Sequence, residues 1–295
     1  MKIATIIVNY NDAEETAKYV KKISKFEIID RIVVVDNLST APNNMEILNE
    51  LKNGKVEVIR AEKNGGYSYG NNFGMKYLEE NNENYDYTII SNPDIDIEEN
   101  AIKKCVQVLE SDGEIAIAAP RMYNFSGNPI RRSSWKIRTF MLDVIHSTRL
   151  LELLFYSKLR AGEYSADEYS KDLLEVEAIS GAFFIVKTAV FREVGYFDEN
   201  VFLFYEEDIL SKKLIKMGYK IVSVNSEKVV HYESQTIGKT ISYYKKIQQL
   251  YLSKMYYQKK YNKINFWQIG AFKILNICRK IELIIEIPIR KILKK

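Results

Sequence analysis

Cysteine, histidine and tryptophan are scarce in this 295-residue chain, which holds only two of each. Cys105 and Cys278 lie in separate apolar, helix-like stretches, so we expect no disulfide framework and a reducing, cytoplasmic environment. No cluster of cysteine and histidine has the spacing of zinc ligands. No run of about 18 uncharged apolar residues is present, which excludes a membrane-spanning helix. The apolar run Ile3–Val8 is short and lacks a cleavage site, so it is interpreted as a buried strand and not as a signal peptide.

Charge is distributed unevenly along the chain. The segment 262–295 contains eight lysines or arginines and two glutamates, a local charge of +6, although the whole chain carries only +4. The remaining residues therefore carry −2, which disfavours a nucleic-acid partner for the main body.

Apolar runs alternate with helical patterns through the first half of the chain. Strands are expected at Ile3–Val8, Arg31–Val35, Lys55–Ile59, Asp86–Ile90 and Ile115–Ala119, and helices at Asp12–Ser24, Pro42–Leu51, Tyr67–Glu80 and Glu98–Leu109. Later signals predict strands within Val176–Lys187, Lys220–Val224 and Val229–His231, and a helix at Asp208–Met217. This alternation predicts an α/β fold with a mostly parallel sheet and helices on both faces.

Two interruptions of the pattern suggest the domain organisation. A main domain is expected over residues 1–238, with a variable helical segment at 137–175. Residues 239–295 are expected to form a C-terminal helical appendage. There are no internal repeats and no linker rich in proline or serine.

Polar residues follow four of the predicted strands, namely Asn9-Tyr10-Asn11, Asp36-Asn37, Asn64-Gly65-Gly66 and Asp94-Ile95-Asp96. Open α/β sheets bind ligands at the carboxyl ends of their strands. Each motif also has a purely structural reading. Asp36 suits a turn, the glycine pair suits a tight turn, and Asp94 or Asp96 suits a helix N-cap. The two carboxylates flanked by Asn92-Pro93 favour a divalent cation, because burying them costs free energy without a cation or hydrogen-bond donors.

A second acidic cluster, Glu206-Glu207-Asp208, follows the apolar run Val201–Tyr205. Acidic residues at a helix N-terminus are stabilised by the helix dipole, which is the structural alternative. A carboxylate delivered by a buried segment can instead deprotonate a hydroxyl group, so the cluster is a candidate general base. His231 is a candidate metal or diphosphate ligand, whereas His146 receives no role.

The chain resembles the family 2 glycosyltransferases of the GT-A fold over about residues 3–235. The matching stretches are Ile6–Asn11, Val34–Ser39, Asn64–Gly74, Asn92–Asp96, Ser180–Phe184, Val194–Glu199 and Phe204–Asp208. Within the family the chain is most similar to rhamnosyltransferase-like members that build bacterial cell-surface polysaccharides.

The resemblance implies an inverting transfer of a sugar from a nucleotide-diphosphate donor to a hydroxyl of a saccharide or lipid-linked acceptor. It assigns donor contacts to Asn9, Tyr10, Asp36, Asn64, Gly65, Asp94 and Gly181. Asp94 and Asp96 would hold Mg²⁺ or Mn²⁺, with Asp96 the more direct ligand, and His231 would complete the metal site. Asp208 would be the catalytic base, with Glu207 as the alternative.

Two departures from the family pattern stand out. The run Ile209–Lys213 replaces the usual second acid and arginine, which puts the acceptor-side contacts in question. No Gln-x-x-Arg-Trp motif occurs, which disfavours a processive polymer synthase. The competing interpretations are a nucleotidyltransferase, which should carry a glycine-rich loop with arginine after the first strand, and a non-catalytic scaffold on the same fold.

The tail has an apolar helical face at 271, 274, 275, 278, 281, 284 and 285, followed by Pro288 and four basic residues. A basic amphipathic helix is typical of an interfacial membrane element. We therefore expect a peripheral location on the inner face of the cell membrane. The alternative is packing on the body or on a partner subunit, including a homo-oligomer through these helices.

Overall fold

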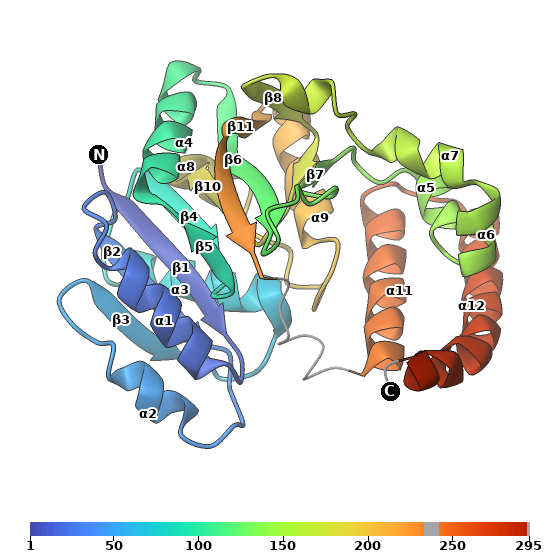
Figure 1. Cartoon of the computed structure of the whole chain (residues 1–295), viewed down its shortest axis with the longest axis horizontal. Helices are drawn as coiled ribbons and strands as arrows, with labels where there is room; N and C mark the ends of the chain where they lie inside the picture. The colour runs from blue at the N-terminus through green and yellow to red at the C-terminus, as the bar shows by residue number, and fades with distance from the viewer. Residues whose placement is uncertain (233–241, 294–295) are drawn as a thin grey trace.

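Strand β1 (Ile3–Asn9) lies inside the parallel half of the sheet, and its apolar side chains are buried on both faces. It pairs in parallel with β2 (Arg31–Asp36) and β4 (Tyr87–Ser91), and β3 (Val56–Arg60) forms the edge beyond β2. The structure is a computed structural model that describes residues 1–232 and 242–293. Figure 1 shows this sheet beside a separate group of helices.

The other half of the sheet is mixed. Strand β10 (Phe183–Lys187) runs antiparallel to both β4 and β6 (Ile115–Asn124), and β11 (Lys220–His231) runs parallel to β6. Strands β5 (Ile95–Ile97) and β8 (Leu173–Val176) both pair antiparallel with β11. Two short strands, β7 (Ser134–Trp135) and β9 (Ala178–Ile179), form a second small sheet.

Helices cover both faces of the large sheet. The layer on one face comprises α1 (Ala13–Ile23), α2 (Asn44–Asn49) and α4 (Glu99–Ser111). The layer on the other face comprises α3 (Gly66–Glu80), α8 (Thr188–Glu193) and α9 (Glu206–Lys216). Successive side chains of β1 point to opposite faces of the sheet, so Ile3 and Ile7 belong to the hydrophobic core on the first face and Ala4 and Ile6 to the core on the second.

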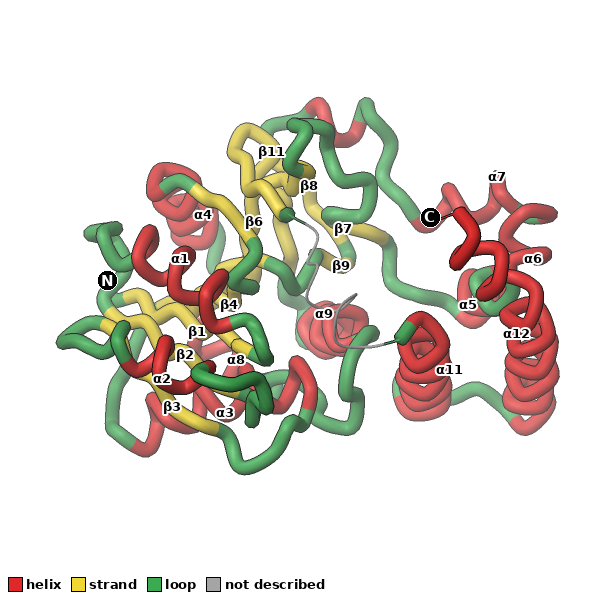
Figure 2. The backbone as a smooth tube through the Cα atoms, turned by 60° about the horizontal axis from the view of Figure 1, so that its bottom comes forward, coloured by secondary structure: helices red, strands yellow, loops and turns green. Residues whose placement is uncertain are grey.

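The remaining helices lie together. The variable segment contributes α5 (Phe140–Ile145), α6 (Arg149–Leu154) and α7 (Tyr156–Leu159), and the C-terminal appendage contributes α11 (Tyr243–Lys260) and α12 (Phe266–Leu293). Two short 3₁₀ turns follow α7, at Arg160–Gly162 and Glu168–Ser170. Helix α9 lies between the sheet and α11 in Figure 2. A small apolar core joins them, because Tyr257 of α11 packs with Val201, Tyr205 and Ile209. The appendage is therefore packed against the start of α9.

The expected α/β fold class is confirmed, and the elements differ mainly at their ends. The two strands expected at Lys220–Val224 and Val229–His231 are one strand, β11, with an irregular register between Val224 and Lys228. The strand signal within Val176–Lys187 is divided among β8, β9 and β10. Helix α9 begins at Glu206, two residues before the expected start, so all three acids lie in its first turn.

The tail differs from expectation at Pro288. Helix α12 continues through this proline to Leu293, and Figure 1 shows its last turns bent away from its earlier axis. The expected domain boundary at 238/239 lies outside the described residues, so the two-part division stays a prediction. The side chains of the terminal basic residues 290, 291, 294 and 295 also lie outside the described part.

Candidate active site

Asp36 and Asn9 meet at the carboxyl ends of β2 and β1, where they are direct neighbours in the register. Both residues have no exposed surface. Asp36 accepts hydrogen bonds from Nδ2 of Asn9 at 3.1 Å, from Nδ2 of Asn44 at 2.9 Å and from the backbone N–H of Ser39 at 3.2 Å. The guanidinium of Arg60 lies 3.5 Å away. In this structure the pair orders the strand ends, and the donor contact expected of Asn9 and Asp36 stays a prediction.

The Asn64-Gly65-Gly66 turn lies beside these strand ends. Oδ1 of Asn64 accepts from Nδ2 of Asn37 at 3.1 Å and from the backbone N–H of Gly66 at 3.2 Å. Gly66 has φ +86°, and a Cβ there would lie 1.9 Å from the carbonyl oxygen of Phe202. Only glycine fits this position, which brings the turn against the loop that leads into α9.

Tyr10 and Gly65, the other two donor residues expected in this region, are both half-buried. Their place at the sheet edge leaves them accessible to a ligand, unlike Asn9 and Asp36.

Asp94 and His231 are brought together by the pairing of β5 with β11. His231 is the register partner of Ile95, and the backbone N–H of Tyr232 donates to the carbonyl of Asp94 at 3.0 Å. Nε2 of His231 lies 3.4 Å from Oδ2 of Asp94. Asp94 is only 6% exposed, and neither of its carboxylate oxygens has a hydrogen-bond partner among the described residues. A buried carboxylate without donors fits a site for a divalent cation.

Asp96 lies apart from this pair. Its carboxylate accepts a hydrogen bond from Nζ of Lys22 on α1, and Lys22 also donates to Glu98 at 2.8 Å. Among the described residues no three histidine, cysteine, aspartate or glutamate side chains gather as a metal cluster. In this structure Lys22 occupies the carboxylate of Asp96, whereas that of Asp94 accepts no hydrogen bond, and which of the two is the more direct metal ligand stays a prediction.

Gly181 connects the Asp94 region to α9. The backbone N–H of Asn92 donates to the carbonyl of Ala182 at 2.8 Å, and the backbone N–H of Gly181 donates to Oε1 of Glu207 at 3.1 Å. A Cβ on Gly181 would lie 3.0 Å from the same Glu207 oxygen and 3.1 Å from the hydroxyl of Tyr67. Burial raises the pKa of Glu207. The segment Gly181-Ala182 therefore contacts both Asn92, two residues before Asp94, and Glu207 of α9.

Asp208 is the third acid in the first turn of α9 and is 4% exposed. Its Oδ1 accepts from the indole N–H of Trp135 at 3.2 Å and from the backbone N–H of Arg138 at 3.2 Å. Burial raises the pKa of Asp208 to about 7, although the guanidinium of Arg138 acts in the opposite direction. A carboxyl group that titrates near neutral pH is suited to general-base catalysis.

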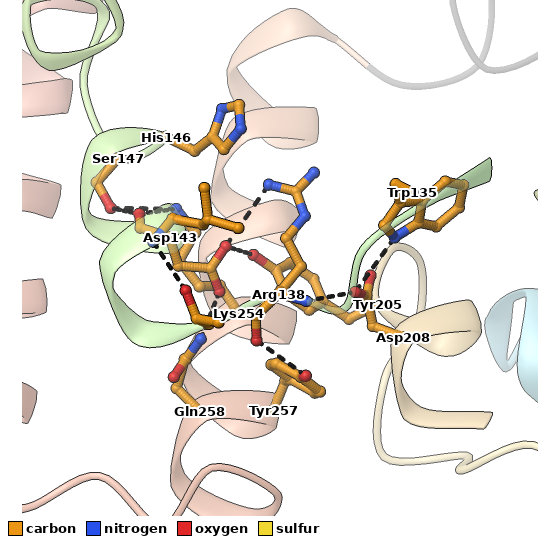
Figure 3. A network of polar contacts seen from close by, with 12 residues as sticks. Trp135, Arg138, Asp143, His146, Ser147, Tyr205, Asp208, Lys254, Tyr257 and Gln258 are labelled. Atoms are coloured by element: carbon orange, nitrogen blue, oxygen red, sulfur yellow. Dashed lines mark hydrogen bonds and ion pairs between the residues drawn. The ribbon is translucent and has the colours of Figure 1, made fainter. Parts of the chain in front are cut away.

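Arg138 is braced by a polar network that Figure 3 shows at close range. Nη1 of Arg138 lies 3.6 Å from Asp143, which has no exposed surface. Asp143 also accepts from the hydroxyl of Tyr205 at 2.6 Å and from Nε2 of Gln258 at 2.6 Å. The hydroxyl of Tyr257 donates to the backbone carbonyl of Arg138 at 3.0 Å. Helices α5 and α11 therefore hold the segment that orients Asp208.

The lysines of the run Ile209–Lys213 have structural partners. Nζ of Lys212 donates to Oδ1 of Asn262 and lies 5.5 Å from the centre of the Tyr257 ring. Nζ of Lys213 donates to the carbonyl of Tyr196 at 2.8 Å. The two lysines that depart from the family pattern therefore connect α9 to Asn262 and to the backbone of Tyr196.

The sequence analysis missed Trp135, Arg138 and Asp143. A signal was present, since Arg131-Arg132-Ser133-Ser134-Trp135-Lys136-Ile137-Arg138 holds four basic residues and a tryptophan within eight positions. The segment stands far from α9 in the sequence, and only the fold brings it to Asp208.

The chain is similar to proteins that are already known. The low-salt glycan biosynthesis hexosyltransferase Agl10 of Haloferax volcanii is 29% identical over 206 residues, which cover 70% of this chain and 59% of that protein. The chain thus spans less than two thirds of the length of this curated relative.

Two solved structures show the same fold. GalNAc-T7, crystallised with UDP, GalNAc and Mn²⁺, matches with a TM-score of 0.58 and 18% identity, over 78% of this chain and 44% of that one. TarS of S. aureus in complex with UDP-GlcNAc matches with a TM-score of 0.56 and 14% identity, over 94% of this chain and 70% of that one. At these identities the likeness concerns the fold alone. The model of Glycosyl transferase family 2 matches residues 5–194, more than half of the chain, and this protein belongs to that family.

Proposed function

We propose that the chain is a metal-dependent, inverting and non-processive glycosyltransferase. One observation carries the proposal. Asp94 is a buried carboxylate that accepts no hydrogen bond, and the first turn of α9 holds Glu207 and Asp208, two acids whose pKa is raised by burial. Raised carboxyl pKa values of this kind are typical of catalytic sites.

The roles follow from the surroundings of each residue. Asp94 and His231 would hold the cation, Mg²⁺ or Mn²⁺, which supplies positive charge to a leaving diphosphate when it is bound. The oxygen of the acceptor hydroxyl forms a bond to the anomeric carbon as the bond from that carbon to the diphosphate breaks. Asp208 takes the proton of the hydroxyl, and Glu207 is the second candidate for this role.

The donor is proposed to be a sugar linked to a nucleoside diphosphate. Support comes from neighbours of the same fold that were solved with UDP or UDP-GlcNAc. The proposed donor contacts of this chain are Asn9, Tyr10, Asp36, Asn64, Gly65, Asp94 and Gly181. Rhamnose is the sugar that the sequence resemblance favours, and a role in bacterial cell-surface polysaccharide synthesis is proposed on the same basis.

The acceptor is proposed to be a saccharide or lipid-linked hydroxyl presented at the inner leaflet. The described helices include none that is both long and apolar enough to cross a bilayer. Helix α12 nevertheless presents Phe266, Trp267, Ile281 and Ile284 to solvent, each more than half exposed. An apolar helix face with basic flanks suits an interfacial location. A homo-oligomer through the same face is the competing proposal.

One experiment tests the reaction directly. Full-length protein is incubated with a panel of nucleotide sugars and Mn²⁺, and slow donor hydrolysis is measured without an acceptor. We expect one donor to be hydrolysed in a metal-dependent manner. The same assay on Asp94→Asn should show neither hydrolysis nor metal-dependent donor binding. A nucleotidyltransferase would instead form a sugar nucleotide from a sugar phosphate, and a non-catalytic scaffold would bind the donor without hydrolysis in any condition.

A further inference from the structure

Arg138 lies between two carboxylates, those of Asp208 and Asp143, as Figure 3 shows. Its backbone N–H donates to Oδ1 of Asp208 at 3.2 Å, and the indole N–H of Trp135 donates to the same oxygen. Its guanidinium extends toward Asp143, with Nη1 3.6 Å from Oδ1 of that residue. The backbone of Arg138 therefore fixes the position of the candidate base, and the charge of its side chain is shared between two carboxylates.

Asp143 holds this charge only loosely. Its Oδ1 also accepts the hydroxyl of Tyr205 at 2.6 Å, and its Oδ2 accepts Nε2 of Gln258 at 2.6 Å. A charge-assisted N–H to carboxylate hydrogen bond measures about 2.7–2.9 Å, so the 3.6 Å approach of Arg138 is not one. The side chain of Arg138 is 21% exposed, which leaves little water to screen its charge. Much of that charge is therefore available to act on Asp208.

Asp208 is surrounded by ionisable groups from α9, α5, α11 and the segments beside them. These groups are the acids Glu206, Glu207 and Asp143, the cations Arg138 and Lys212, and the phenols Tyr205 and Tyr257. Burial, Asp143 and Glu207 raise the pKa of Asp208, and the charge of Arg138 is the strongest influence that lowers it. Burial also raises the pKa of both phenols, which keeps them neutral.

We propose that Arg138 is the positioning residue of the candidate base: its backbone N–H fixes the carboxylate of Asp208, and its side-chain charge keeps that carboxylate ionised at neutral pH. The inference rests on the proposed function and adds a residue to its acceptor side. Asp143 determines how much of the charge reaches Asp208. Because Gln258 of α11 holds Asp143, the C-terminal appendage influences the ionisation of the base as well as its orientation.

The chain contains a direct probe of this ionisation. Only two tryptophans are present, and one of them, Trp135, donates to the carboxylate of Asp208. The other, Trp267, is 79% exposed, so Trp267→Phe should remove its signal without disturbing the fold. In this parent protein the fluorescence of Trp135 is followed from about pH 5 to about pH 9. We expect a transition with a midpoint of about 7 that is absent in Asp208→Asn. No transition in the parent, or one that Asp208→Asn retains, would overturn the proposal.

Arg138→Met keeps the backbone donor and removes the charge. We expect the midpoint to rise by about one pH unit, because a nearby opposite charge lowers the pKa of a carboxyl by this order. Arg138→Lys should restore the midpoint of the parent. The matched control is Arg131→Met, because Arg131 lies in the same segment and pairs with Glu163 at 2.5 Å; it should leave the midpoint unchanged. An unchanged or lower midpoint in Arg138→Met would overturn the proposal.

The direction of the shift separates this role from a purely structural one. A loosened segment would expose Asp208 to water and move its midpoint down, toward the ordinary pKa of 3.8, whereas loss of the charge moves it up. Since Arg138→Met leaves the buried Asp143 without its cation, Arg138→Met/Asp143→Asn is the charge-balanced companion. Its midpoint should lie between those of the parent and Arg138→Met, because Asp143 raises the pKa of Asp208 less than Arg138 lowers it. A value outside this interval would overturn the division of charge between the two carboxylates.

Donor hydrolysis with Mn²⁺ is measured on the same proteins. Below neutral pH, Arg138→Met should be about tenfold slower than the parent, because a rise of one unit leaves about a tenth of the carboxylate ionised. At about pH 9 its rate should recover, with an unchanged KM for the donor. A rate that stays low at that pH would assign Arg138 a structural role and overturn the proposal.

The two readouts also separate this inference from the proposed function. A parent that hydrolyses a donor, with no shift of the midpoint in Arg138→Met, contradicts the inference alone. A shift of the midpoint without hydrolysis of any donor contradicts the proposed function and leaves the effect of Arg138 on Asp208 in place.

Discussion

The backbone N–H of Arg138 donates a hydrogen bond of 3.2 Å to Oδ1 of Asp208, the same oxygen that accepts the indole N–H of Trp135. Because both donors act on one oxygen, the carboxylate has a fixed orientation at the start of α9. Arg138 is itself held by Asp143, whose carboxylate accepts from Gln258 of α11. The C-terminal helices therefore support the candidate base from outside the family-matched region.

Replacement of Asp208 by asparagine should separate binding from chemistry. The amide keeps the size of the side chain but cannot accept a proton from the acceptor, so transfer should fall by about 10² to 10⁴-fold. Donor affinity should be unchanged, as measured by titration with the preferred nucleotide sugar. Glu207→Gln is the matched comparison. If Glu207→Gln loses transfer and Asp208→Asn retains it, the base is Glu207.

The pH dependence of transfer should follow the ionisation of Asp208. Its pKa of about 7 means that the rate should rise as pH increases toward 7 and level off above it, because only the carboxylate can take a proton. A pH–rate profile measured from about pH 5 to about pH 9 covers the ionisation of Asp208. A profile that is flat across neutral pH would rule out a base with this pKa.

The same ionisation should make the fold less stable as pH rises. In the unfolded chain the Asp208 carboxyl has its ordinary pKa of 3.8, whereas in the folded chain its pKa is raised to about 7. Between these values the unfolded state releases the proton first, so the free energy of unfolding decreases with increasing pH. The full effect is on the order of 4 kcal/mol.

Asp208→Asn should weaken this dependence and raise the Tm at pH 8 relative to the wild type, while the raised pKa values of Glu206 and Glu207 preserve the remainder. Thermal unfolding of both proteins at pH 5 and pH 8 measures the change in Tm. An equal or lower Tm for the variant at pH 8 would contradict the raised pKa.

Gly181→Ala should impair activity more than stability. The new methyl group would meet Oε1 of Glu207 at 3.0 Å and the hydroxyl of Tyr67 at 3.1 Å, so both must move. Overpacking of this kind costs about 1–3 kcal/mol and should displace Glu207 from its backbone donor. Gly113→Ala is the control, because a Cβ there has no atom within 4 Å. Wild-type turnover by Gly181→Ala would show that the Glu207 position is not critical.

Metal dependence should distinguish Asp94 from Asp96. Asp94→Asn should weaken Mn²⁺-dependent donor binding, because the unpartnered oxygens of Asp94 are the candidate ligands. Asp96→Asn should leave that binding nearly unchanged and instead loosen Lys22 of α1. Titration of Mn²⁺ at fixed donor concentration measures both. The reverse ranking would restore the assignment that the sequence resemblance favoured.

Asp94 and Asp96 show which features of the site could not be predicted from the sequence. The continuous apolar runs of β1, β2 and β4 were readable because strands buried on both faces have no other pattern. The convergence of the strand ends followed from the parallel sheet. The choice between Asp94 and Asp96 depends on Lys22, which lies more than seventy positions away, and no local pattern records that contact.

The orientation of α12 was a second limit. The helical period set an apolar face apart from Arg279 and Glu282, but much of that face is exposed, whereas Phe272 and Leu283, which lie outside it, are buried. Glu282 settles the matter by capping the backbone of α6, and this contact needs the folded appendage. Likewise, the segment 131–138 reaches Asp208 only through the small sheet of β7 and β9.

The outward face of α12 gives the last prediction, which concerns attachment to membranes. Ile277→Asp/Ile281→Asp places two charges on positions that are 58% and 57% exposed, so the fold should be retained. Binding to anionic liposomes should fall strongly, because each buried isoleucine contributes about 1.5–3 kcal/mol. Phe125→Asp is the control, since Phe125 is 77% exposed in the sheet domain.

Sedimentation with liposomes and size-exclusion chromatography are run on the same proteins. If the double variant loses liposome binding while its oligomeric state is unchanged, the face binds the bilayer. If it dissociates a dimer and still sediments with liposomes, the face is a contact between copies of the chain. The second outcome would remove the membrane from the proposed function without affecting the assignments of Asp94 and Asp208, because neither residue contacts the outward face of α12.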